Sequence, residues 1–118
     1  MAKGDDIEER LIAFAVRVIR VSEALPSTSA GQHIKGQLLR SGTSPAANYA
    51  EARNAESTKD FIHKLRIVVK ELNETQIWLK IAIQSKLMAG DRLQALGDEC
   101  DQLCRIIGAS IQTARGNS

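Results

Sequence analysis

Residues that interrupt secondary structure or staple small domains are scarce in this sequence. Its 118 residues include two prolines, two cysteines, one tryptophan, one tyrosine and two phenylalanines. Two cysteines are too few for a disulfide framework. Two prolines and eight glycines supply little of the turn chemistry that a many-stranded β protein needs. These absences favour an all-α protein, and the length fits one domain over residues 1–118.

Charge of one sign and long apolar runs are also missing. The 16 basic and 14 acidic residues give a formal net charge of +2, so a nucleic-acid role would have to rest on a local patch or on oligomerisation. No apolar run approaches the roughly 18 residues that a membrane span requires. The charged N-terminus also lacks the apolar region of a signal peptide. We therefore expect a cytoplasmic protein with no membrane partner.

The sequence does contain the apolar periodicity of a helical bundle. Apolar residues make up 43% of the chain and recur at alternating steps of four and three, the spacing of one buried helix face. In the first such segment, residues 5–25, this seam consists of Ile7, Leu11, Phe14, Val18, Val21 and Leu25. A second stripe beside it, formed by Ile12, Ala15 and Ile19, adds apolar surface that predicts an interface with another molecule.

Three breaks divide this periodicity into four helices. At the first break Thr28 or Ser29 can cap the next helix, and at the second Ser57 begins a capping box with Asp60. At the third, Gly90 suits a helix C-terminus; Asp91 is then a candidate N-cap. The predicted helices span residues 5–25, 29–53, 57–86 and 91–114. Long helices joined by short loops predict an antiparallel up-down-up-down four-helix bundle.

Pro45 falls inside the second predicted helix, where its ring removes a backbone donor. Two interpretations are open. The helix is continuous from residue 29 to 53 and kinked near Pro45, or it stops and restarts with Ser44 as N-cap and Pro45 at the first helical position. We favour the single kinked helix.

Signatures of catalysis are absent, and the sequence predicts no enzyme, no cofactor and no metal site. A di-metal bundle needs Glu-x-x-His pairs; none occurs, and the histidines are His33 and His63. Cys100 and Cys104 lack a second ligand pair for zinc and are expected to pack in the core. No glycine-rich phosphate loop is present. Serines such as Ser41 are expected to cap backbone groups near helix breaks.

Two polar patterns remain as candidate sites. On the second helix, one face carries polar residues at steps of four, four and three, and the third helix carries others at steps of three and four. We expect a structural network between these helices, with a ligand or partner site as the alternative, and partial burial of its charges. Loss of Arg40 would then cost on the order of 3 kcal/mol. The network consists of Arg40, Ser44, Asn48, Glu51, Glu71, Glu74 and Trp78.

The second pattern is a basic stripe on the third helix, where four basic residues follow at steps of four, three and four. It consists of Lys59, His63, Arg66 and Lys70. Such a face is either solvated surface or a contact for phosphates or an acidic partner.

Three segments carry a family resemblance. Residues 40–52 read RSGTSPAANYAEA, residues 60–65 read DFIHKL and residues 70–75 read KELNET, followed by Trp78-Leu79. This chain resembles the bacterial four helix bundle protein family, whose first members are encoded in intervening sequences of large-subunit ribosomal RNA genes. The resemblance implies an up-down-up-down bundle that assembles as a ring, commonly a homopentamer. The chain is also similar to the accessory variability proteins of diversity-generating retroelements, which are pentameric barrels that contact a reverse transcriptase and nucleic acid.

Two functions follow as hypotheses. The first is a non-enzymatic homo-oligomeric protein, most simply a homopentamer, that acts as an interaction scaffold or accessory subunit for a protein partner. The alternative is an accessory protein that binds RNA or DNA weakly and without sequence preference through the basic stripe.

Overall fold

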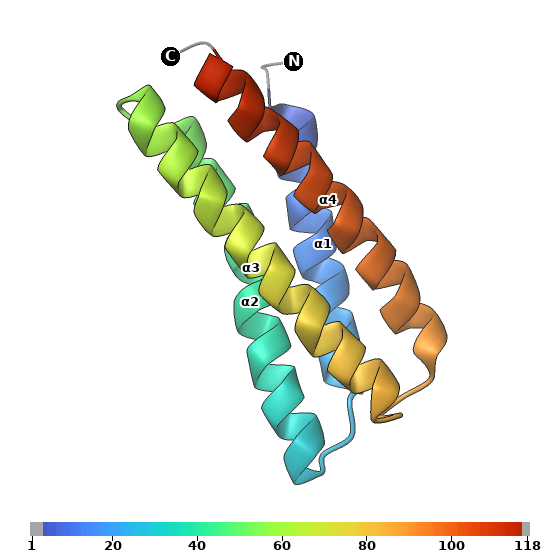
Figure 1. The fold of residues 1–118 in the computed structure, drawn as a ribbon. Coiled ribbons are helices and arrows are strands. Elements are labelled where there is room, and N and C mark those ends of the chain that lie inside the picture. The colour runs from blue at the N-terminus through green and yellow to red at the C-terminus, as the bar shows by residue number, and fades with distance from the viewer. Residues whose placement is uncertain (1–3, 117–118) are drawn as a thin grey trace.

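A computed structural model describes residues 4–116 and forms four α-helices within them. α2 packs against both α1 and α3, and α4 packs against both α3 and α1, whereas no Cα atom of α1 lies within 8 Å of one of α3. Each helix starts at the end of the bundle where the preceding one stops (Figure 1). The helices are α1 (Asp5–Ala24), α2 (Ser29–Arg53), α3 (Thr58–Gln84) and α4 (Gly90–Gly116). The predicted all-α bundle is confirmed; residues 1–3 and 117–118 of the predicted domain lie outside the described part.

The predicted seams form the core. In α1, Leu11 and Val18 are completely buried, and in α4 the seam from Leu93 to Ile107 is buried as well. Leu65, Val68 and Leu72 contribute the corresponding face of α3. Burial of these aliphatic side chains supplies the main driving force for packing the four helices together.

The helix starts follow the predicted capping chemistry. The Thr28 hydroxyl accepts a hydrogen bond from the backbone N–H of Gly31 at 3.1 Å, and the Ser57 hydroxyl accepts one from that of Asp60 at 3.0 Å. Each side chain satisfies a backbone donor that the first turn leaves unpaired. Pro45 lies buried within an unbroken α2, so the stop-and-restart interpretation with Ser44 as N-cap is wrong. The bend at Pro45 stays a prediction.

The junction between α3 and α4 differs from the prediction. α3 ends at Gln84, and Lys86 adopts a left-handed conformation with φ 56°. The N–H of Lys86 bonds to the carbonyl of Ile83 and that of Leu87 to the carbonyl of Ala82, which is the Schellman pattern that ends many helices. Lysine therefore takes the position that the sequence pattern assigned to a glycine.

As a consequence, Gly90 does not end α3 but begins α4. Asp91 lies inside the first turn of α4 instead of capping it. Its charge still favours this end of the helix, because the helix dipole is positive there.

A layer of small residues in α2 sets the spacing of three helices. A Cβ atom added to Gly42 would lie 2.7 Å from Cγ1 of Val18 in α1, so α1 packs directly on the α2 backbone. The neighbouring Ser41 is fully buried, and its hydroxyl lies 2.9 Å from that of Thr75 in α3. The expected capping role of Ser41 is wrong, because this residue lies within α2 and pairs across helices.

We predict that Gly42→Ala lowers the free energy of unfolding by about 1–3 kcal/mol, because the added methyl group overlaps Val18 in a packed core. Gly36 is a matched control in the same helix, since a Cβ there meets nothing within 4 Å. Gly36→Ala should raise stability by roughly 0.5–1 kcal/mol through helix propensity. Urea unfolding of both variants measures the difference. Equal effects of the two substitutions would disprove close packing at Gly42.

Candidate interaction site

The predicted polar network forms between α2 and α3 around one guanidinium group. Arg40 places Nη1 3.3 Å from Oε2 of Glu71, and its Nη2 bonds to the carboxylate of Glu74. The indole N–H of Trp78 donates to the same Glu74 oxygen at 3.0 Å. Gln37, which the sequence analysis did not include, accepts from Nη2 of Arg40 at 3.0 Å. These bonds link the two helices and favour a single register between them.

Other members of the network lie elsewhere. The Asn48 amide donates to the carbonyl and hydroxyl of Ser44 within α2, both at 3.1 Å, so it does not cross to α3. Glu51 does cross, because Nζ of Lys64 lies 3.4 Å from its carboxylate. The prediction of partial burial is correct for Asn48 and Glu74. It is wrong for Arg40 and Glu51, which are exposed. The side chain of Arg40 is 49% exposed, which makes this a surface network.

Electrostatics within the network favour the ionised carboxylate. The hydrogen bond from the Trp78 indole, followed by that from Arg40, holds the pKa of Glu74 below its usual range. The charge of Lys70 acts in the same direction. On the α2 side, the His33 ring meets the Trp78 ring edge to face, with centroids 5.6 Å apart. The polar groups of Arg40, Glu74 and Trp78 thus bond to one another, and these contacts hold α2 against α3.

The basic stripe lies on the outer face of α3. Lys59, His63, Arg66 and Lys70 are all exposed, and none of them forms an ion pair or hydrogen bond with a residue between 4 and 116. A shallow depression of about 360 Å³ is lined by Lys59, His63 and Arg66 of this stripe together with Thr58 and Ile62. The stripe is therefore available to an external partner.

Two apolar patches interrupt the polar surface of the described helices. The α1 patch consists of Ile12, Val16 and Ile19, which are 49%, 38% and 42% exposed. The α3 patch consists of Ile77 and Ile81, which are 53% and 41% exposed. Ile12 and Ile19 were predicted from the sequence as surplus apolar surface, whereas the α3 patch was not. The spacing of Ile77 and Ile81, one helical turn apart and off the seam, is the signal that could have revealed it.

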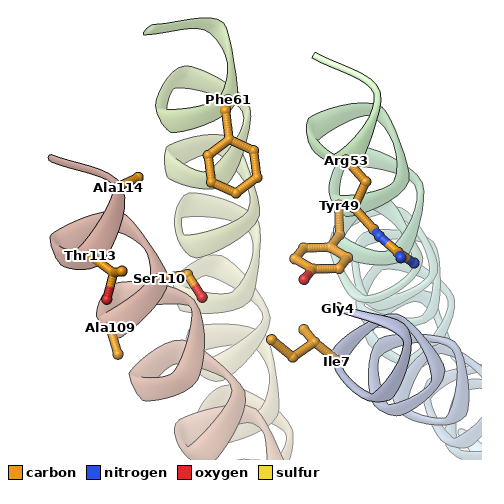
Figure 2. A pocket seen from close by; sticks show the side chains of 9 residues that line it. All are labelled: Gly4, Ile7, Tyr49, Arg53, Phe61, Ala109, Ser110, Thr113 and Ala114. Atoms are coloured by element: carbon orange, nitrogen blue, oxygen red, sulfur yellow. The ribbon is translucent and has the colours of Figure 1, made fainter. Parts of the chain in front are cut away.

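A pocket of about 570 Å³ opens where the N-terminal ends of α1 and α3 meet the C-terminal ends of α2 and α4. Tyr49, Ile7 and Phe61 point into it (Figure 2). Burial raises the pKa of the Tyr49 phenol, which therefore stays protonated at neutral pH. Arg53 at the rim pairs with Asp5 at 2.8 Å and Glu8 at 3.3 Å. These ion pairs fasten α2 to α1 at this end of the bundle.

The titratable side chains of residues 4–116 include no group of three or more His, Cys, Asp or Glu that could hold a metal ion. Cys100 is buried, and its thiol donates to the carbonyl of Leu72 at 3.2 Å. The neighbouring Cys104 side chain, together with burial, raises the pKa of Cys100. Cys104 is half-buried on the same helix. No described helix is both long enough and apolar enough to cross a membrane.

These features define a class of protein: a small all-α bundle. Its distinctive surface features in the described residues are the two apolar patches and the basic stripe. The chain belongs to the 23S rRNA-intervening sequence protein family, whose model matches residues 5–109. A search of curated proteins finds no match.

A solved structure shares the fold over most of the chain. It is a protein of unknown function from the S23 ribosomal protein family of Bacteroides thetaiotaomicron, 31% identical in sequence with a TM-score of 0.84. The match covers 89% of this chain and 97% of that one. The family membership expected from residues 40–79 is thus confirmed. The likeness to retroelement accessory proteins stays a prediction.

We predict that Arg40→Ala lowers the free energy of unfolding by about 1 kcal/mol or less at pH 7. The value is smaller than the sequence suggested, because exposed ion pairs are worth little. The folded pKa of Glu74 is lowered, so the stabilisation is present above the pKa of an unfolded carboxyl, about 4.3, and is lost as pH falls through the folded value. The difference from wild type should therefore shrink as pH falls from about 5 to 3.

Denaturant unfolding at pH 7 and at pH 3 measures this difference. Arg105→Ala is the control, since Arg105 forms an exposed pair with Asp101 within α4 and its loss should change little. An Arg40 effect of several kcal/mol, or one that is constant with pH, would contradict this electrostatic origin.

Proposed function

We propose that this protein is a non-enzymatic, cytoplasmic, homo-oligomeric scaffold or accessory subunit. Its copies associate when the α1 patch of one copy docks on the α3 patch of the next. The observation that supports this proposal is the exposure of two separate apolar patches on helices that are not neighbours in the bundle. Exposed apolar surface of this kind is typical of protein–protein contact sites.

The positions of the two patches favour a ring. Two unlike patches form a heterologous contact, which either closes into a ring or extends into a filament. Since α1 and α3 occupy diagonal positions in the bundle, each copy presents one patch to each of two neighbours. A homopentamer is the closed form that we propose.

Charges beside the patches match the same pairing. α1 and α3 run in the same direction within one copy (Figure 1), and each carries an exposed charged stretch before its apolar patch. The α1 patch follows an acidic stretch that includes Glu9, whereas the α3 patch follows the basic stripe. Parallel packing of α1 on a neighbour's α3 therefore brings acid opposite base and apolar opposite apolar.

The spacing along the two helices also agrees. Glu9 precedes Val16 by seven residues, and Lys70 precedes Ile77 by seven, which is about 10 Å along either helix axis. When Val16 opposes Ile77, Glu9 therefore opposes Lys70. Glu9 makes no ion pair within residues 4–116 and is exposed, so its carboxylate is available to a neighbouring copy.

We predict that light scattering on a sizing column gives a particle of about 65 kDa, five times the 12.9 kDa chain. Ile77→Glu should yield the 12.9 kDa monomer, because it places a charge in the apolar contact. Gln94→Glu, at an exposed position of α4, is the matched control and should keep the wild-type mass. Circular dichroism checks that both variants stay folded. A wild-type monomer at micromolar concentration would refute the proposal.

A charge exchange tests the register within this interface. Glu9→Lys should weaken association by roughly tenfold, and adding Lys70→Glu should restore it, because the double variant reverses the pair without removing it. A double variant no better than the single one would contradict this register while leaving self-association itself intact.

The second candidate function is weak binding of RNA or DNA, which the exposed and unpaired basic stripe favours. Lys59, Arg66 and Lys70 give each subunit three permanent charges. In the proposed ring Lys70 faces Glu9 of a neighbour, so this binding is an alternative to that contact. We predict binding without sequence preference that weakens steeply between about 50 and 200 mM salt.

Fluorescence anisotropy with labelled RNA and duplex DNA measures this binding. Lys59→Gln combined with Arg66→Gln should weaken it, whereas the control Lys80→Gln with Lys86→Gln should not. Binding that ignores salt would refute the electrostatic mechanism, and no binding at low salt would remove this candidate.

A further inference from the structure

Three arginines meet at a groove that neither proposed function uses. Arg17 and Arg20 from α1 and Arg92 from α4 line a groove of about 250 Å³ between these two helices. The groove is completed by Val21, Ala95 and Leu96, of which Val21 and Leu96 are buried core residues. Three arginine side chains, of which Arg20 and Arg92 are exposed, thus line a small space together with apolar residues.

These arginines differ from most others in the described chain in lacking a carboxylate partner. Arg10 pairs with Glu99 at 2.7 Å, and Arg105 pairs with Asp101 at 3.0 Å. Arg40 and Arg53 also pair with carboxylates. In contrast, the three groove arginines form no ion pair and no hydrogen bond with any residue from 4 to 116.

The acidic side chains one turn beyond the groove residues are engaged with other cations. Glu23, three residues after Arg20, pairs with Lys35 at 3.5 Å, and Glu99, three residues after Leu96, accepts two hydrogen bonds from Arg10. Arg92 lies in the first turn of α4, where the helix dipole disfavours a cation, and Asp91 is the one acidic residue in that turn. An anion bound between the arginines would relieve their mutual repulsion.

We propose that this groove binds a phosphate group. Guanidinium groups form bidentate hydrogen bonds with phosphate oxygens, and their planar geometry suits this contact better than an ammonium group does. A volume of about 250 Å³ is large enough for one or two phosphates. The phosphate comes from a free diphosphate or from a nucleic-acid backbone, and the chemistry of recognition is the same for both.

Calorimetric titration with inorganic pyrophosphate at about 20 mM salt tests the groove directly. The variant Arg17→Gln with Arg92→Gln should weaken binding by about tenfold or more, because both losses remove charge-assisted hydrogen bonds. The control Lys80→Gln with Arg105→Gln removes the same two charges elsewhere and should change binding less than twofold. Amide NMR shifts of wild type should move at Arg92 and Ala95, which locates the site without any substitution.

A parallel titration with a short duplex oligonucleotide distinguishes the two sources. Pyrophosphate binding that depends on the groove supports a small diphosphate ligand, and oligonucleotide binding with the same dependence, but without pyrophosphate binding, supports a backbone phosphate. The proposal is overturned if neither probe binds, or if the control variant loses as much affinity as the groove variant. Self-association can fail its own test without affecting this result, because that test changes Ile77, Glu9 and Lys70, none of which lines the groove.

Discussion

The close approach of α2 to two neighbouring helices is the constraint on which the rest of this bundle depends. Gly42 allows Val18 of α1 to pack on the α2 backbone. The adjacent Ser41 hydroxyl accepts a buried hydrogen bond from the Thr75 hydroxyl of α3. A larger residue at either position would push one neighbour away. With α1 and α3 both held against α2, α4 can close the bundle only between their remaining faces, as the helix contacts show.

This closure leaves the helices unequal in what they expose. α2 and α3 are fastened along their length by surface polar groups, from His33 and Trp78 at one end to Glu51 and Lys64 at the other. α1 and α4 are joined by the Arg10–Glu99 pair, and the arginine groove lies between them. The proposed partner surfaces therefore lie where the bundle has not satisfied its own groups: the apolar patches on α1 and α3, the basic stripe and the groove.

Carboxylate pairing explains much of this division. Arg53 joins Asp5 and Glu8 across α1 and α2, and Arg40 joins Glu71 and Glu74 across α2 and α3. These pairs are partly exposed, so their contribution to stability is small, but they remove their charges from competition for ligands. Charges without such partners keep their full attraction for an external anion or for an acidic neighbour.

The sequence by itself determined the helices, their buried seams and the family. The helical period of 3.6 residues appears directly in the spacing of apolar residues such as Leu11, Val18 and Leu72, because this spacing is a local property of the chain. It also indicated the contact of Arg40 with carboxylates of α3, since facing helices present residues at matching steps. It misassigned Gly90, because a left-handed Lys86 ends α3 through local bonds without a glycine. It misassigned Ser41, because the buried bond of this residue is to Thr75, which is distant in sequence. Only the tertiary structure decided that Arg17, Arg20 and Arg92 share one groove and that Arg40 is exposed, because the distance between side chains on different helices is fixed by packing and not by spacing along the chain.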